Sequence, residues 1–387
     1  MSAAPPLTIA QSSSAYAANT SRADSLFSPL VDFLCLGGGS LLLVALIASA
    51  QFFIDLRPQI IVASALVAHF VNNPHFANSY QLFYSKFREK LASERYAKGM
   101  RVRYAFAGIV VPAGLFSFIL CCALTSNATL LTKAVGAMSF LAGWHYVKQG
   151  YGILIVTSVL KKAFFSTVEK RIALISAYCC WICFWLGANY SLAKRDFFGI
   201  QYYTAAVPQW LLIASLAVAI FTTLATTWMF LRKWHLENRW LALNGVLAYL
   251  MTIYAWLLLL LDPLYVFVIP ACHSLQYLLI VWRYRINLEN DGTKTDGMPF
   301  ANIMGNSKFR FALFVAVGIV LGYLGFWHLP ELLDEFVRYD RASFGASLFL
   351  FSFWIFINIH HYAMDNVMWR RGNPDTTKYL FAHQSGK

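Results

Sequence analysis

The sequence predicts an all-α fold, a polytopic transmembrane bundle of about ten helices. Three observations lead to it. The 387 residues are 59% hydrophobic and only 13% charged, whereas soluble globular chains carry roughly 25% charged residues. Apolar runs of about 20 residues, the length that crosses a bilayer as a helix, recur along the whole chain. Lys and Arg collect in the loops after every second run, as they do where loops face the cytoplasm.

The apolar runs define the elements in chain order. Residues 1–28 are rich in Ser and Ala and lack the basic segment of a signal peptide, so they predict a disordered cytoplasmic tail. Residues 29–368 form the expected transmembrane domain, and residues 369–387 a cytoplasmic C-terminal tail. Asp262-Pro263 divides the seventh run from the eighth, because proline favours a turn over one continuous helix. The ten runs are 30–54, 58–84, 103–125, 128–160, 172–192, 207–231, 239–261, 264–283, 309–328 and 344–368.

The loop charges predict the orientation. The loop at 86–103 alone holds seven Lys and Arg residues, and the loops after runs four, six, eight and ten are also basic. The loop after run nine is acidic. An even number of spans therefore places both termini in the cytoplasm, which predicts a multi-pass integral membrane protein, of the bacterial inner membrane. The net charge of +13 fits a membrane lipid partner and no nucleic acid, since no soluble module carries a basic face.

Histidines inside the runs are the candidate site, because ionisable residues are costly to bury in a membrane and mark function there. His235, His328 and His383 are loop or interface residues, and the other six lie on the even-numbered runs two, four, eight and ten. Their matched depth is informative: His75, His273 and His360 precede the next basic loop residue by about ten positions, or roughly 15 Å of helix. Four helices that deliver imidazole at a similar level predict one metal centre. These histidines are His69, His75, His145, His273, His360 and His361.

Two histidine pairs cannot both face that centre. His360 and His361 project about 100° apart, and His69 and His75 about 240° apart. The expected metal ligands are therefore His75, His145, His273 and His360.

The remaining polar neighbours are expected to support these ligands. Asp365 lies four residues after His361 and shares its helix face. Amides and a carboxylate there can hydrogen-bond the far ring nitrogens and set their tautomers. Tyr277 and Asp365 are the expected catalytic residues, Tyr277 as a fifth ligand or proton donor. The expected supporting layer is His69, Asn78, Gln149, Gln276 and His361.

The chemistry of this ligand set predicts the function. Imidazole nitrogen suits iron, copper or zinc. Non-haem Fe²⁺ is the expected ion for redox chemistry on a substrate dissolved in the membrane, with copper and zinc as alternatives. The expected activity is an oxygenase that combines O2 with a hydrophobic small molecule, a polyene, terpenoid or fatty chain. Two other functions remain open: a proton-coupled transporter with a His/Asp relay, and a bis-histidine haem electron carrier. The oligomeric state is not predicted.

Four short motifs resemble the Brp/Blh-type β-carotene 15,15′-dioxygenases. They are Pro74-His75, His145-Tyr146, His273-Ser274, and His360 through Asp365 to Trp369-Arg370. The resemblance implies a multispan fold, one non-haem iron held by histidines, and cleavage of a carotenoid to retinal. The chain departs from the family at two positions: Ser79 stands where the first motif has an Asp, and Tyr277 where the third has a second His.

Overall fold

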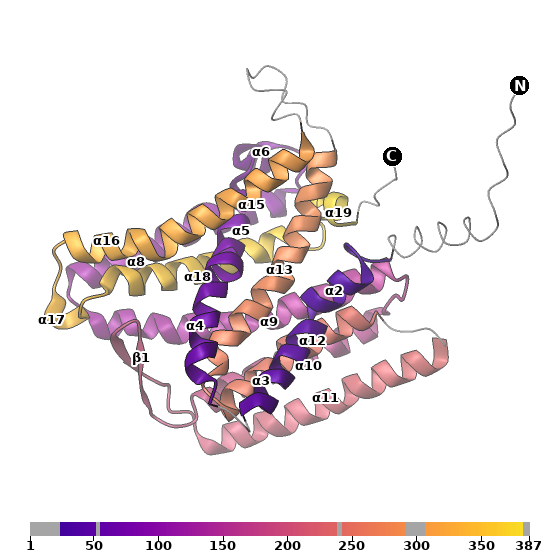
Figure 1. Cartoon of the computed structure of the whole chain (residues 1–387), viewed down its shortest axis with the longest axis horizontal. Helices are drawn as coiled ribbons and strands as arrows, with labels where there is room; N and C mark the ends of the chain where they lie inside the picture. Colours follow the sequence, from indigo (N-terminus) through magenta and orange to yellow (C-terminus); the bar gives the residue numbers. More distant parts are fainter. Residues whose placement is uncertain (1–23, 52–54, 238–241, 292–305, 382–387) are drawn as a thin grey trace, which may run out of the picture.

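The computed structural model describes residues 24–51, 55–237, 242–291 and 306–381, and these are almost entirely helical (Figure 1). The predicted all-α class is confirmed. A short antiparallel hairpin of β1 and β2 interrupts the helices between α10 and α11. The described elements are α2 (Pro29–Leu36), α3 (Gly38–Gln51), α4 (Arg57–Val67), η1 (Ala68–Asn72), α5 (Asn73–Tyr84), α6 (Phe87–Ala92), α7 (Lys98–Ala105), η2 (Phe106–Val110), α8 (Val111–Leu124), α9 (Ala128–Leu160), α10 (Thr167–Ala188), β1 (Lys194–Phe197), β2 (Ile200–Tyr203), α11 (Gln209–Glu237), α12 (Leu243–Leu261), α13 (Tyr265–Asn290), α15 (Ser307–Tyr323), η3 (Leu324–His328), α16 (Leu329–Phe336), α17 (Arg341–Phe344), α18 (Leu348–Met368) and α19 (Pro374–Phe381).

Six helical segments of the described chain are long and apolar enough to cross a membrane, consistent with a membrane protein. The bent pair of α2 and α3, which meet at 51°, would make a seventh span. Helices α9, α12 and α18 occupy the other three predicted runs, but they are not among these segments. The count of ten spans therefore stays a prediction. The six segments are Arg57–Tyr84, Lys98–Leu124, Thr167–Ala188, Gln209–Leu236, Tyr265–Asn290 and Ser307–Phe336.

Three wide turns of π-helix, η1, η2 and η3, each end two residues before a proline: Pro74, Pro112 and Pro330. Proline has no N–H, and its ring crowds the carbonyl four residues earlier. A π-turn shifts that carbonyl aside, so the helix can continue through the proline. In η2 the Val111 N–H bonds the Phe106 carbonyl, and Pro112 has no N–H to offer the next carbonyl, that of Ala107. This carbonyl acquires a side-chain donor instead.

Helix α5, which carries His75, packs closely on α15 through two glycines. A Cβ added at Gly318 would lie 2.1 Å from Asn78 Oδ1, and one at Gly322 would lie 3.0 Å from Asn73. Small residues four positions apart allow two helices to approach closely where both are apolar. This contact fixes how far α5 stands from the outer helix, and hence where His75 lies.

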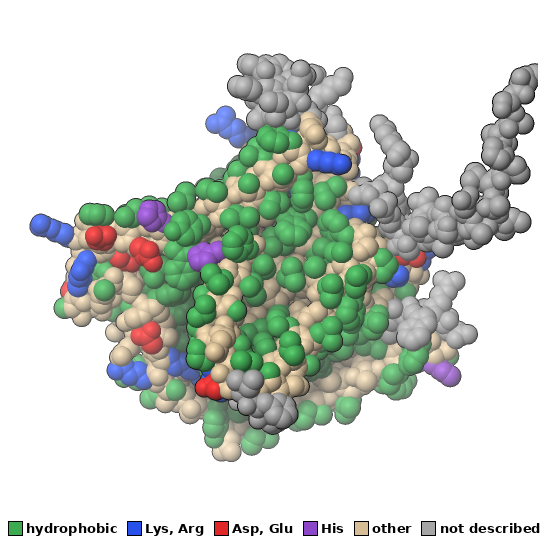
Figure 2. Space-filling model, viewed as in Figure 1, with side chains coloured by type: hydrophobic (Ala, Val, Ile, Leu, Met, Phe, Trp, Pro, Cys, Tyr) green, Lys and Arg blue, Asp and Glu red, His purple; other side chains and the backbone are tan. Residues whose placement is uncertain are grey.

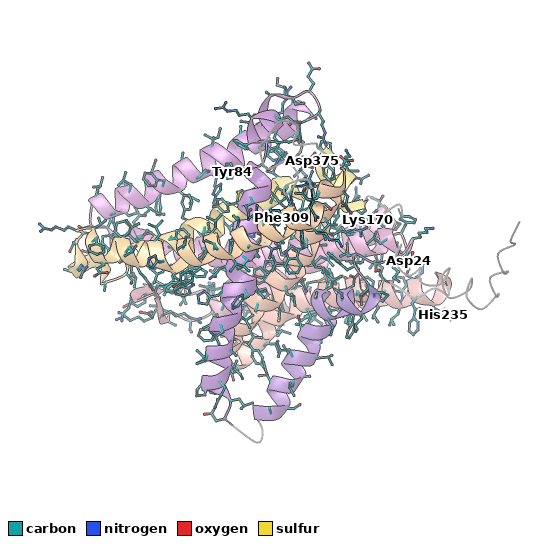
Figure 3. The ribbon with its side chains drawn as sticks, turned by 45° about the horizontal axis from the view of Figure 1, so that its top comes forward. Asp24, Tyr84, Lys170, His235, Phe309 and Asp375 are labelled. Carbon is teal, nitrogen blue, oxygen red and sulfur yellow. The ribbon has the colours of Figure 1, made fainter. Side chains whose placement is uncertain are left out.

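The loops that the sequence predicts to be basic contact one another at one end of the bundle. They come from five different places in the chain, and ion pairs link them in two groups of three and two loops. In Figure 3, Asp24, Lys170, His235 and Asp375 lie toward the right of the molecule, where this end is seen. Figure 2 shows hydrophobic side chains over most of the face between the charged edges. The linking pairs are Arg95–Asp375, Lys378–Asp291 and Lys233–Glu169.

The two ends of the described chain also meet there. Leu26 and Leu380 belong to one buried cluster, and Arg283 donates to the Leu26 carbonyl at 2.8 Å. The predicted tail of residues 1–28 lies outside the described residues as far as residue 23. Within the described part of this segment, Leu26 is fully buried. The predicted tail 369–387 likewise contains a packed helix, α19 (Pro374–Phe381).

Candidate metal centre

Four imidazole rings from four helices meet inside the bundle. They belong to His75 on α5, His145 on α9, His273 on α13 and His361 on α18. Ring centroids lie 4.7 Å apart for His75 and His361, 4.9 Å for His145 and His361, 5.0 Å for His145 and His273, and 5.6 Å for His75 and His273. All four side chains are buried. The structure thus brings together the four even-numbered runs that the sequence places at one depth.

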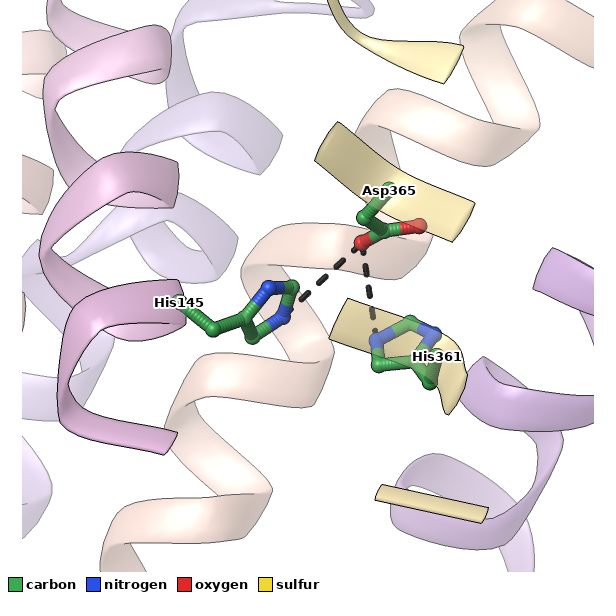
Figure 4. Close-up of side chains that lie close together, drawn as sticks. All are labelled: His145, His361 and Asp365. Atoms are coloured by element: carbon green, nitrogen blue, oxygen red, sulfur yellow. Dashed lines mark ion pairs between the residues drawn. The ribbon is translucent and has the colours of Figure 1, made fainter. Parts of the chain in front are cut away.

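Asp365 completes this group, which we call the histidine cluster: His75, His145, His273, His361 and Asp365. Its Oδ2 atom lies 3.5 Å from His361 Nε2 and 3.8 Å from His145 Nε2 (Figure 4). Ligand atoms of His145, His361 and Asp365 all lie within 4.8 Å of one another. The carboxylate expected to support the site therefore stands among the candidate ligands themselves.

Hydroxyl groups hold Asp365 in this orientation. Tyr277 donates to its Oδ1 atom at 2.7 Å, and Ser79 donates to the same atom at 2.9 Å. Trp369 Nε1 donates to the Tyr277 hydroxyl at 3.3 Å. Two donors on Oδ1 leave Oδ2 turned toward the imidazoles. Tyr277, expected as a fifth ligand or proton donor, instead contacts the carboxylate from behind.

The tautomer of His75 is set by its surroundings. Its Nδ1 lies 2.8 Å from the Asn72 carbonyl oxygen, which can only accept, so Nδ1 carries the proton. Ser274 lies 2.9 Å from the same nitrogen and donates to Asn72 Oδ1 at 2.6 Å. The lone pair of His75 therefore resides on Nε2. That atom lies 3.1 Å from His361 Nε2, so the two rings point at one another.

Several polar atoms of the histidine cluster are buried without a hydrogen-bond partner in the described chain. Buried polar atoms in folded proteins are nearly always partnered, and an unpartnered one costs about 1–3 kcal/mol. Here they belong to neighbouring side chains. Two of them, His145 Nε2 and Asp365 Oδ2, lie 3.8 Å apart, where a bound cation or a shared proton would satisfy both. The atoms are His145 Nε2, His273 Nδ1, His273 Nε2, His361 Nδ1 and Asp365 Oδ2.

His360, the expected fourth ligand, lies outside the histidine cluster, and His361 takes the place assigned to it. The His360 Nε2–H donates to the Ala107 carbonyl at 3.0 Å, and Nδ1 lies 2.6 Å from the Tyr80 hydroxyl. Both ring nitrogens are thus partnered. The Ala107 carbonyl is the one that Pro112 cannot bond. The assignment of the two adjacent histidines is therefore reversed, because α18 turns His360 toward α5 and η2.

Two of the expected supporting residues do not contact the histidine cluster. His69 packs near Tyr323 and Trp327, with ring centroids 5.7 and 6.2 Å away. His69 lies within the π-turn η1, and its ring packs against α15 and η3, whereas His75 belongs to the histidine cluster. Asn78 accepts from Gln81 Nε2 at 3.1 Å and packs on Gly318 of α15.

Gln149 and Gln276 support the cluster through the backbone. Gln149 Nε2 donates to the His273 carbonyl at 2.9 Å and lies 3.3 Å from Gln276 Oε1. Gln276 in turn donates to the Leu36 carbonyl at 2.5 Å. The pair therefore ties α9, α13 and α2 together at the level of His273. The expectation that these amides bond the distal ring nitrogens is wrong for His273, whose nitrogens have no such partner.

Aromatic rings enclose the imidazoles. Tyr146 stacks on His273 with centroids 3.7 Å apart and an interplanar angle of 6°, and Tyr362 stacks on His145 at 4.7 Å. Phe76 lies 4.0 Å from His75 and 4.8 Å from His361. Such walls hold the rings in place and exclude water. The sequence signal for them was weak, since Tyr146 and Tyr362 are simply the residues that follow His145 and His361.

The donor set fits a first-row transition metal. Metal–nitrogen and metal–oxygen bonds of about 2.0–2.2 Å place two ligands of one ion up to about 4.4 Å apart. The 3.5 and 3.8 Å separations around Asp365 Oδ2 meet that limit. Two histidines and one carboxylate are the ligand set of non-haem Fe(II) oxygenases, which leave coordination positions open.

Comparison with known proteins identifies no relative: no family model, no curated protein and no solved structure matches the chain. The fold and the site together define a class, an all-helical protein with membrane-length helices around a buried cluster of histidines and one aspartate.

Proposed function

We propose that this protein is a multi-pass membrane oxygenase that uses non-haem iron on a lipophilic substrate. One observation carries the proposal: His145, His361 and Asp365 are buried and offer two imidazoles and one carboxylate within 4.8 Å, and His145 Nε2 and Asp365 Oδ2 have no hydrogen-bond partner in the described chain. Copper or zinc would bind the same nitrogens, so the identity of the ion as iron is itself proposed.

The residues of the histidine cluster have different proposed roles toward the ion. Asp365, held by Tyr277 and Ser79, would offer Oδ2 to the ion, and His145 and His361 would supply two nitrogens. His75, with its lone pair on Nε2, and His273 are the neighbouring imidazoles of the cluster and would serve as further ligands. When bound, Fe(II) would supply the activation of O2 that an unsaturated hydrocarbon needs. Tyr146, Tyr362 and Phe76 keep water from the centre.

The proposed substrate is a polyene, terpenoid or fatty chain. Apolar walls favour a ligand without charge near the reacting carbon. The resemblance to carotenoid-cleaving dioxygenases at four motifs favours the polyene within this class. At Ser79, where that family has an Asp, the hydroxyl donates to Asp365, so the position still serves the carboxylate.

We further propose that all ten runs cross a bacterial inner membrane, with both chain ends in the cytoplasm. The ion pairs among the basic loops and the shared cluster of Leu26 and Leu380 support a common side for the even-numbered loops. Reporter fusions after α13 and after α16 test this. They should report opposite sides, and a common side would refute the count.

Proton-coupled transport is the second candidate. The 3.1 Å separation of His75 Nε2 and His361 Nε2 favours it, because a proton could pass directly between two imidazoles at that distance. A bis-histidine haem fits less well, since axial nitrogens on opposite sides of one iron would stand about 4 Å apart with a macrocycle between them.

Metal analysis and an absorption spectrum of the purified chain separate these functions. The oxygenase predicts about one iron per chain without a Soret band, and O2 consumption on addition of β-carotene or another polyene. Loading the purified chain with Fe(II) under anaerobic conditions replaces any ion lost during purification. Failure to retain any transition metal after loading would refute the oxygenase and favour the relay.

A further inference from the structure

A second site lies away from the histidine cluster, at the basic end of the bundle. An open cavity of about 340 Å³ is formed between α5, α13 and α15. It shares no residue with the histidine cluster. Its lining combines cations with an apolar wall: Gln81, Arg285, Arg310, Leu313, Phe314 and Val317.

The cationic part of this cavity is built around Glu289. Arg285 and Arg310 both pair with its carboxylate, and both guanidiniums are about four-fifths buried. Arg285 also lies over the Phe314 ring at 5.0 Å, and its Nε is buried without a hydrogen-bond partner in the described chain. Two guanidiniums beside one carboxylate leave the site positive. A guanidinium prefers phosphate or carboxylate oxygens as acceptors.

The position of the cavity along the helices is that of a lipid headgroup. Gln81 and Arg285 lie near the ends of the segments Arg57–Tyr84 and Tyr265–Asn290, and Arg310 lies at the start of Ser307–Phe336. All three therefore belong to one end of membrane-length helices. Leu313 and Val317 follow Arg310 by one and two turns of α15, so an apolar strip continues from the cations toward the middle of the helix.

We propose that this cavity binds an anionic phospholipid of the surrounding membrane. The headgroup phosphate would lie against Arg285 and Arg310, and an acyl chain along Leu313 and Val317. Basic pockets between transmembrane helices at the cytoplasmic surface bind acidic lipid headgroups in this way. The site does not depend on the proposed oxygenase, and it can be present whether or not the histidine cluster binds iron.

Thermal unfolding of the delipidated full-length chain in dodecyl maltoside tests this site. Phosphatidylglycerol should raise Tm by roughly 3 °C or more at saturation, and phosphatidylcholine of the same chain length by much less. Inorganic phosphate at equal concentration tests whether a free anion, rather than a lipid, produces the gain in Tm. A gain from phosphate equal to that from phosphatidylglycerol, or equal gains from both lipids, would overturn the proposal.

Matched variants locate the effect. Val317→Trp fills the apolar wall without touching a charge and should abolish the gain from phosphatidylglycerol. Val320→Trp, on the exposed side of the same helix, should keep it. Leu313→Trp repeats the test if Val317→Trp does not fold, and Arg310→Gln should also lower the gain. An undiminished gain in the cavity-filling variant would place the lipid elsewhere.

Discussion

His360 and His361 are adjacent on α18, yet their rings lie in two different kinds of environment. His360 has a partner on each nitrogen, the Ala107 carbonyl and the Tyr80 hydroxyl. His361 has an unpartnered Nδ1, and its Nε2 faces His75 Nε2 at 3.1 Å and Asp365 Oδ2 at 3.5 Å. Both side chains are almost fully buried. Burial alone therefore does not separate them.

The difference lies in what each environment lacks. Both ring nitrogens of His360 have hydrogen-bond partners. This contact between α18, α5 and η2 therefore needs no ligand to satisfy it. Around His361, lone pairs of several side chains converge without enough donors to satisfy them. A folded protein retains such an arrangement when something else completes it. We therefore assign a structural role to the first region and a ligand-binding role to the second.

The largest expected effect is the loss of metal on removal of His361. His361→Ala should reduce bound iron to less than about a tenth of the wild-type level, since one of three closely spaced ligand atoms is lost. His360→Ala should retain it. His145→Ala and Asp365→Ala should behave like His361→Ala, and His75→Ala and His273→Ala should also lose iron. Metal per chain by mass spectrometry is the measurement. Equal losses of iron in His360→Ala and His361→Ala would remove the distinction between the two regions.

A smaller effect is expected from the tyrosines behind each histidine. Tyr277→Phe removes a donor to Asp365 and should weaken metal affinity roughly 10–100-fold, as loss of an outer hydrogen bond usually does. Tyr80→Phe removes the partner of His360 and should leave affinity unchanged. Competition with a chelator measures both. If Tyr80→Phe lowered metal affinity as much as Tyr277→Phe, His360 would belong to the metal site.

The structural role of His360 predicts a change in stability. His360→Ala leaves the Ala107 carbonyl and the Tyr80 hydroxyl unpaired and creates a small void, which together should cost about 2–4 kcal/mol. Pro112→Ala restores an N–H near that carbonyl, and in the His360→Ala background it should recover part of the loss. Thermal or denaturant unfolding in detergent is the readout. An unchanged stability of His360→Ala would contradict the structural assignment.

The smallest effect concerns pH and a residue outside both regions. Lys90 Nζ donates to the Leu82 and Phe83 carbonyls at the end of α5, and burial lowers the pKa of Lys90 to about 8. The unfolded chain, with the ordinary value of about 10.5, binds more protons between these two pH values. Stability from this group should therefore rise with pH above 8, by at most about 1.4 kcal/mol per pH unit.

Lys90→Met is the matched variant for that pH dependence. The difference in Tm between wild type and variant, measured at several pH values from 7 to 10, should shift in favour of the wild type as pH rises. The metal content per chain should be the same in wild type and Lys90→Met, because Lys90 touches no residue of the histidine cluster. A difference in Tm that is constant with pH would contradict the lowered pKa.

Local chemistry in the sequence determined the helices and which of them bring histidines to the site. Hydropathy identified each long helix of the described residues, and Asp262-Pro263 correctly divided α12 from α13. The even-numbered runs carry the rings that meet, and His75, His145 and His273 lie among them. These features depend on properties that one segment possesses by itself: apolar length, the 1.5 Å rise of a helix, and the lack of an N–H at proline.

Only the tertiary structure decided which of two adjacent histidines joins the cluster. A helix presents residues about 100° apart, and its rotation about its own axis is set by its neighbours. Here η2 leaves the Ala107 carbonyl for His360, and that contact turns His361 and Asp365 toward α5 and α9. The same holds for His69, which lies in the π-turn η1 beside Tyr323 and Trp327, and for α19, which packs beside the Leu26 segment. Contacts between residues more than a hundred positions apart decide such rotations, and no single segment of the sequence contains them.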